Sequence, residues 1–321
     1  MAKFIPVWQE LGADHWPESQ AKIMVPLTKP RGESRLVLLE DAKGVKWTKA
    51  NSNIEVAVVA KDETLHALNS YLANLSLAEV DRKSLLGALQ ARVTSSLSNG
   101  GQLLEVTGKA VGQSSIKAGT TLLNFVITKP IDYDITFKFL RCLDDDGAMF
   151  DATSHKPSEV DGWINQLHWI LGSQANIWFV STERRTFDIP KQLGFPLKKA
   201  TINSVKEFAE GMDSSADVTV YLVGRYIGDS SSGTTFPDLS SKGDICIVLD
   251  DKCKEIPVVK GDDPFILTLA HELVHFVLDR RGQKGKEHHL FDLDKVLLSK
   301  KIESTVLSAS TLDMLYPPDK K

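Results

Sequence analysis

The sequence predicts a multidomain protein with an N-terminal β-sandwich that carries a helical insertion, followed by a C-terminal α+β domain. Three observations support this prediction. The length of 321 residues favours two domains. Short β-branched runs dominate up to residue 130, whereas strand and helix patterns alternate after it. The second part also contains one helical pattern that is apolar on nearly all sides, which is typical of a buried helix.

Composition and charge exclude several classes of protein. Hydrophobic residues make up 42% and charged residues 25% of the chain, so it can bury globular cores. The net charge of −4 gives no support to a nucleic-acid partner. No apolar run reaches the length of a transmembrane helix. The start of the chain lacks a basic region followed by an apolar stretch, so we expect no classical signal peptide and a protein that is cytoplasmic as synthesised.

The cysteines Cys142, Cys246 and Cys253 are odd in number and lack ligand-like spacing. Cys246 lies in the apolar run ICIVL, which favours a buried free thiol. We therefore expect no disulfide framework.

The N-terminal part begins with a weakly patterned segment, residues 1–20. The runs KIMVPL, SRLVLLED and IEVAVVAK are then short and β-branched, and they predict strands. Residues 62–98 instead carry leucines at helical spacing, which predicts one or two helices. Strands resume after an Asn-Gly-Gly break, in QLLEVTGKAVGQSSIKA and TLLNFVITKP.

Residues 103–118, LLEVTGKAVGQSSIKA, resemble the closing stretch of bacterial immunoglobulin-like (Big-type) domains, which is followed by a last strand such as residues 122–128. The resemblance covers residues 21–130 and implies an immunoglobulin-like β-sandwich, with residues 62–98 as an insertion. Such domains bind, space or dock other molecules. The resemblance therefore implies a secretion-system or surface partner for this domain, although fold alone does not settle function.

The second domain is expected to span residues 131–321, after Lys129-Pro130. Its predicted elements, in order, are a strand (133–143), a helix (158–173), a strand (175–182), a short helix (201–212), a strand (218–227), a Ser-Gly-rich loop (229–243), a strand (244–251) and the apolar helix (263–281).

The apolar helix, DPFILTLAHELVHFVLDRR, contains a complete H-E-x-x-H motif formed by His271, Glu272 and His275. Residues four apart lie on one face of a helix, so both imidazoles can bind a single metal ion. Glu272 falls near the same face, where it can take a proton from a metal-bound water. Because buried polar groups need partners, a zinc ion would satisfy all three side chains.

The flanking residues predict where this helix begins and ends. Asp262 or Asp263 is a good N-cap and Pro264 suits the first helical position. Gly282 can stop the helix.

The order of strand, helix, further strands and metal helix resembles the zincin proteases, and TLAHELVHFVLD resembles the active-site helix of the metzincins among them. This resemblance implies a zinc endopeptidase, a metalloprotease hydrolase that acts on a protein or peptide with Glu272 as general base. It also implies that an edge strand before the helix pairs with the substrate. We assign that role to DICIVLDD, residues 244–251.

A catalytic zinc needs a third protein ligand. The metzincin pattern H-E-x-x-H-x-x-G-x-x-H fails here, because Leu278 and Arg281 stand in place of its glycine and last histidine. We expect His289 to be the third ligand, with His288 as the alternative. His289 is followed by x-x-Asp and an apolar turn, an order seen in related enzymes.

The rival class is the gluzincins, whose third ligand is a glutamate on a later helix, here Glu303. The methionine-containing turn of the metzincins also has two candidate positions. Leu297-Leu298 lies at the right distance but lacks methionine, whereas Met314, close to Tyr316, lies near the last residue of the sequence.

Two other interpretations follow from the same residues. The protein is a binding or docking module whose zincin domain is structural or inactive, or it is a bacterial effector protease exported by a specialised secretion system. Glu272 argues against the first interpretation, since a structural zinc site does not use a general base.

Overall fold

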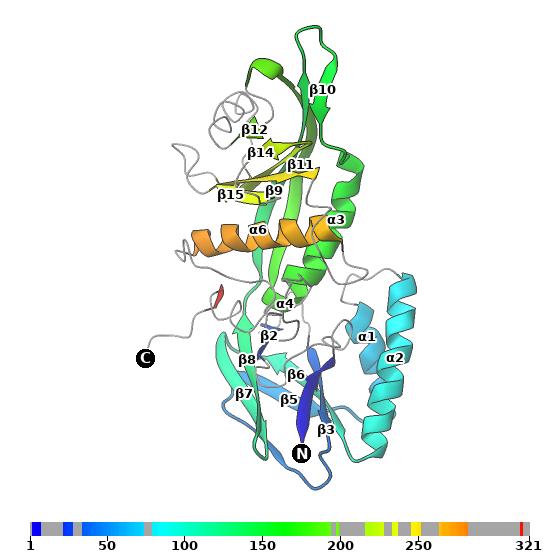
Figure 1. Cartoon of the computed structure of the whole chain (residues 1–321). Helices are drawn as coiled ribbons and strands as arrows, with labels where there is room; N and C mark the ends of the chain where they lie inside the picture. The colour runs from blue at the N-terminus through cyan, green and yellow to red at the C-terminus, as the bar shows by residue number, and fades with distance from the viewer. Residues whose placement is uncertain are drawn as a thin grey trace, which may run out of the picture. The chain divides into compact units, whose positions relative to one another are not determined.

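Figure 1 shows the fold, a computed structural model of the chain. It describes residues 2–7, 22–27, 34–73, 79–193, 197–198, 216–227, 233–236, 245–251, 263–281 and 315–316. The chain divides into two compact units. Unit 1 comprises Met1–Ile131, His168–Ile177 and Val306–Lys321, and unit 2 comprises Asp132–Leu167 and Trp178–Thr305.

Unit 1 contains two four-stranded sheets. The first has the order β1 (Lys3–Pro6), β3 (Arg35–Glu40), β6 (Gln102–Gly108), β5 (Ile54–Val58), and all its pairs are antiparallel. The second has the order β2 (Lys22–Pro26), β8 (Thr121–Thr128), β7 (Gly112–Ala118), β4 (Trp47–Lys49), with β2 and β8 parallel. Strand β1 lies inside the segment 1–20, which therefore contributes to the first sheet.

The two sheets of unit 1 approach each other closely at Gly108. A Cβ atom there would lie 2.7 Å from the carbonyl oxygen of Pro26 on β2, so a larger residue could not keep this approach. The side chain of Arg35 on β3 is also buried, and its Nε donates to the carbonyl of Met24 on β2 at 3.1 Å. A buried guanidinium needs such acceptors, and this bond links one sheet to the other.

Two helices occupy the stretch that was expected to be helical, α1 (Thr64–Ala73) and α2 (Glu79–Ser98). The pair packs on β3 and β6. Its buried side chains include Leu68, Leu72, Leu89 and Val93, which follow the spacing seen in the sequence. The helical content of this segment is thus confirmed, whereas the immunoglobulin-like assignment stays a prediction.

Unit 2 is built on a six-stranded sheet. Its strands are β9 (Ile131–Leu143), β10 (Met149–Ala152), β11 (Ile177–Pro190), β13 (Val218–Val223), β15 (Gly233–Phe236) and β16 (Ile245–Asp250). The order is β10-β9-β13-β16-β15, and β11 also pairs with β9. Strands β9, β13 and β16 are parallel, whereas β15 is antiparallel to β16. A separate parallel pair joins β12 (Leu197–Lys198) to β14 (Tyr226–Ile227).

Two sequence expectations about this sheet were wrong. Within DICIVLDD, residues 245–250 form β16, but β16 pairs with β13 on one side and β15 on the other, so it is not an edge strand. Among the strands that the structure describes, the sheet instead ends at β15, which lies within residues 229–243, expected to be a loop. The short run TTF is β-branched and aromatic, and its pairing with β16 stabilises it as a strand.

The helix expected at 158–173 is present but is not uniform. A 3₁₀ turn (Pro157–Glu159) leads into α3 (Val160–Leu167), which continues through a π-helical turn (His168–Gly172) into the short α4 (Ser173–Ala175). Asn176 follows in the left-handed region, with φ of 55°, which asparagine tolerates better than most residues.

Other expectations for unit 2 have mixed outcomes. The helix predicted at 201–212 lies outside the described residues. Cys142 on β9 is buried with a free thiol, and burial raises its pKa. No helix in the described part of the chain is long and apolar enough to cross a membrane.

Candidate active site

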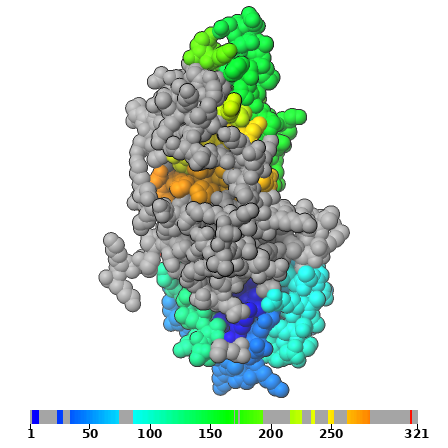
Figure 2. All heavy atoms as spheres, in the orientation of Figure 1, coloured from blue at the N-terminus to red at the C-terminus, as the bar shows by residue number. Residues whose placement is uncertain are grey.

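The candidate site is centred on α6 (Pro264–Arg280). Asp263 is its N-cap and accepts a hydrogen bond from the backbone N–H of Phe265 at 3.0 Å, and Pro264 takes the first position, as predicted. Gly282, the expected stop, lies outside the described residues. The helix packs against β15 and β16 of unit 2, and part of it reaches the molecular surface in Figure 2.

Burial of α6 follows from its apolar sequence. Twelve of its 17 residues are buried: Phe265, Ile266, Leu267, Thr268, Leu269, Ala270, Glu272, Leu273, Val274, Phe276, Val277 and Leu278. The prediction of a helix buried on nearly all sides is confirmed.

The two histidines of the motif lie next to each other on this helix. The ring centroids of His271 and His275 are 4.9 Å apart, with their planes at 72°. Both residues are partly exposed, whereas Glu272 is only 7% exposed. Two neighbouring imidazoles that solvent can reach, beside a buried carboxylate, match the donor chemistry of a catalytic zinc site.

Strand β15 contacts the motif directly. The hydroxyl of Thr235 donates to the carboxylate of Glu272 and also lies 3.1 Å from the backbone oxygen of Glu272. A hydrogen bond to a carboxylate is stronger than one between neutral groups. The strand that ends the sheet is therefore bonded to the acidic residue of the H-E-x-x-H motif.

Gly233 allows this close contact. A Cβ atom at this position would lie 2.6 Å from Cδ2 of Leu249, 2.9 Å from Cγ2 of Thr268 and 3.2 Å from Cγ of Glu272. Real Cβ atoms essentially never approach another atom to within 3.0 Å, so a side chain here would displace the ends of the Leu249 and Thr268 side chains. Glycine thus leaves room for these side chains beside β15.

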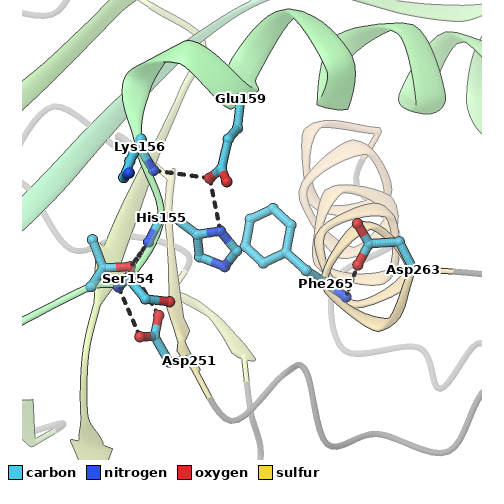
Figure 3. A network of polar contacts seen from close by, with 8 residues as sticks. Ser154, His155, Lys156, Glu159, Asp251, Asp263 and Phe265 are labelled. Atoms are coloured by element: carbon cyan, nitrogen blue, oxygen red, sulfur yellow. Dashed lines mark hydrogen bonds and ion pairs between the residues drawn. The ribbon is translucent and has the colours of Figure 1, made fainter.

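A polar network supports the first turn of α6 (Figure 3). Asp251, just after β16, accepts from the hydroxyl of Thr153 at 2.9 Å and from the backbone N–H of Ser154 at 2.8 Å. These bonds fix the segment after β10 to the end of β16.

His155 belongs to the same network and not to the motif. Its Nδ1 lies 3.1 Å from Oε2 of Glu159, which also accepts from the backbone N–H of Lys156 at 2.9 Å. The imidazole packs against two aromatic rings. Its ring centroid lies 4.2 Å from that of Phe265, in the first turn of α6, and 5.2 Å from that of Trp163. We interpret His155 as a structural residue that holds the start of the helix.

The other end of α6 is held against the sheet of unit 2. The rings of Phe276 and Tyr133 meet edge to face at 4.9 Å, and burial raises the pKa of the Tyr133 phenol. The guanidinium of Arg280 donates to the carbonyl of Asp217, just before β13, at 3.1 Å. Both ends of the helix are thus fixed, which restricts the motif between them.

The remaining predicted site residues fall elsewhere. The candidate third ligands His288, His289 and Glu303, and the candidate turn residues Leu297, Leu298 and Met314, lie outside the described residues. Tyr316 is described in unit 1, where its hydroxyl donates to the carbonyl of Ala175. Within the described ranges, no group of three or more His, Cys, Asp or Glu side chains is arranged to hold a metal ion.

The sequence did not predict that Gly233 and Thr235 belong to the site. They fall in a stretch that the sequence predicts to be a loop, because a run of only four residues is flanked by serine, glycine and proline. The β-forming run Thr234-Thr235-Phe236 was the available signal.

The comparisons with known proteins do not assign this chain to a family. No family model matches it, and no curated protein matches its sequence. Two solved structures are similar to it at low levels. "Structure of a chaperone-substrate complex" has 14% identity and a TM-score of 0.28, over 55% of this chain and 30% of that chain. "Crystal Structure of metalloproteinase-II from Bacteroides fragilis" has 10% identity and a TM-score of 0.31, over 92% of this chain and 85% of that chain.

This chain therefore spans less than a third of the first structure's length and most of the second's. One distant structural neighbour is named a metalloproteinase, at a similarity too low to assign a family.

Proposed function

We propose that this protein is a zinc-dependent endopeptidase in which His271 and His275 bind the metal and Glu272 is the general base. The observation that carries the proposal is the pair of adjacent imidazoles, 4.9 Å apart between ring centroids, beside a buried carboxylate on one buried helix. Incidental surface histidines would not be followed by a buried glutamate that a hydroxyl from another strand holds in place.

Zinc, when bound, polarises the scissile carbonyl and lowers the pKa of water toward neutrality. The chain supplies the proton transfers. Glu272 accepts the proton of the attacking water and delivers it to the leaving amine, as a general base and then a general acid. Its burial favours this role, because a water-poor site strengthens electrostatic interactions with the developing charges.

The substrate strand is assigned to β15 in place of β16. Among the described strands of unit 2, β15 ends the sheet and pairs with β16, so we propose that its other edge pairs with an extended peptide. Its Thr235 contacts Glu272, so a peptide paired with this edge would pass close to the general base. We infer that main-chain pairing with β15 presents the scissile bond.

We propose a metzincin-like zincin for unit 2, with His289 as third ligand and His288 as its alternative. A gluzincin with Glu303 in that role is the competing arrangement. Zinc content of the separate variants His288→Ala, His289→Ala and Glu303→Ala distinguishes them. We expect loss of zinc in His289→Ala alone, because a site with two protein ligands binds the metal much more weakly. Loss in Glu303→Ala alone would contradict the metzincin assignment.

Peptide hydrolysis and its dependence on metal test the function itself. We expect cleavage of unstructured protein substrates that stops when a zinc chelator is added and returns when zinc is restored. Cleavage that persists in chelator would contradict a metal-dependent mechanism. Failure to cleave any of a broad set of substrates, with zinc bound, would favour the binding-module interpretation.

A further inference from the structure

We infer that Thr235 is a positioning residue for the general base, holding the carboxylate of Glu272 in the orientation that the reaction needs. This inference rests on the proposed function. It adds to the H-E-x-x-H motif a residue that lies 36 positions before His271 and on a different element, β15.

The hydroxyl of Thr235 has one proton and two acceptors within reach, the backbone oxygen of Glu272 and its carboxylate. The carboxylate is the stronger acceptor when ionised, so the proton is directed to it. A glutamate side chain otherwise has several rotamers, and fixing one carboxylate oxygen removes much of that freedom. The bond therefore orients the second oxygen as well, since the two oxygens are part of one rigid group.

The strand that carries Thr235 is itself held firmly. Thr235 pairs with Ile247 and Gly233 pairs with Leu249 in the register between β15 and β16. Residues two apart in a strand share a face, so both Gly233 and Thr235 face α6. A Cβ atom at Gly233 would lie 3.2 Å from Cγ of Glu272, so glycine leaves room for this side chain beside β15. The position of the hydroxyl is thus set by backbone pairing and not by a flexible loop.

The variant Thr235→Val removes the hydroxyl and keeps the size and branching of the side chain. We expect kcat for peptide hydrolysis to fall by about 10- to 100-fold, the usual cost of losing a partner that orients a functional group. KM should stay within about twofold, because the main-chain edge of β15 is unchanged. Zinc content should also be unchanged. Thr235→Ser retains the hydroxyl and should restore kcat to within about threefold of wild type.

Thr182→Val is the matched control in unit 2. Thr182 lies on β11, and its hydroxyl lies 3.0 Å from that of Thr136 and 3.4 Å from the carbonyl oxygen of Ile135. Both variants replace a threonine that forms a hydrogen bond by valine, but only the change at 235 removes a hydroxyl that contacts the base. Thr182→Val should therefore leave kcat close to the wild-type value.

Thermal unfolding of the metal-free protein gives a readout that is independent of activity. We expect Thr235→Val to lower the unfolding temperature by about 2–4 °C in the wild-type background, as loss of a bond to a charged group predicts. The same change in a Glu272→Ala background should have little effect, because its partner is already absent.

The outcomes separate this inference from the proposed function. Reduced kcat in Thr235→Val, rescue in Thr235→Ser and coupling to Glu272 in the metal-free protein would together support it. An active wild type with equal kcat in Thr235→Val, or equal losses of unfolding temperature in both backgrounds, would overturn the positioning role and leave the proposed function intact. A zinc-loaded wild type without peptidase activity would overturn both.

Discussion

Replacement of Glu272 by glutamine is expected to lower kcat for peptide hydrolysis by about 10²- to 10⁴-fold, the range attributed to general acid–base catalysis. Glutamine is similar in size and can still accept the bond from Thr235, so the helix and its contact with β15 should persist. It cannot take a proton from water at neutral pH, which removes the chemical role alone. The measurement is kcat with the same substrate, together with zinc content, which should equal that of the wild type.

Glu159→Gln is a suitable control for this experiment. Glu159 is also in unit 2 and also accepts hydrogen bonds, from Lys156 and His155, but it lies outside the motif. The same chemical change there should leave kcat near the wild-type value. Normal cleavage by Glu272→Gln would exclude Glu272 as the general base.

The variants His271→Ala and His275→Ala are expected to lose both activity and stabilisation by zinc. A metal that binds only the native state stabilises it by about 3 kcal/mol at a hundredfold excess over its Kd, or an unfolding-temperature increase of about 5–10 °C. We expect this increase for the wild type and for Glu272→Gln, and little or none for either histidine variant. Differential scanning calorimetry with and without added zinc measures it.

His66→Ala serves as control, because His66 lies on the exposed side of α1 in unit 1 and takes no part in the motif. It should keep the full zinc response. An equal response in all variants would mean that zinc binds elsewhere on the chain.

The parts of the site that were predictable from sequence depend on local rules. The N-cap at Asp263, the proline after it and the burial of α6 follow from spacing and composition within one segment. The proximity of His271 and His275 follows from the pitch of the helix. Each of these features is fixed by residues within a few turns of each other, so the sequence pattern carries them.

The parts that were not predictable depend on pairing between distant residues. Strand β15 has only four residues, and what makes it a strand is its antiparallel pairing with β16. The assignment of β16 as the edge strand was wrong for the same reason, since strand order is a tertiary property. The contact between Thr235 and Glu272 joins residues that are 37 positions apart, and no local pattern marks it.

In unit 1, too, the elements set by local sequence patterns were predictable, and those set by pairing with distant strands were not. The leucine spacing predicted α1 and α2, whereas β1 was missed because its four residues show no alternation and owe their structure to β3. The parallel pairing of β2 with β8 links residues about a hundred positions apart and had no signal in the sequence. A docking role for this unit stays a prediction that rests on the resemblance of residues 103–118.

The zinc content of the purified protein tests the central claim most directly. Wild-type protein and the double variant His271→Ala/His275→Ala would be prepared without added metal, and zinc would be measured per chain by mass spectrometry. The proposal predicts close to one zinc ion per wild-type chain and none in the double variant. A wild type that binds no zinc after reconstitution, or a double variant that retains it, would contradict a zinc site on α6.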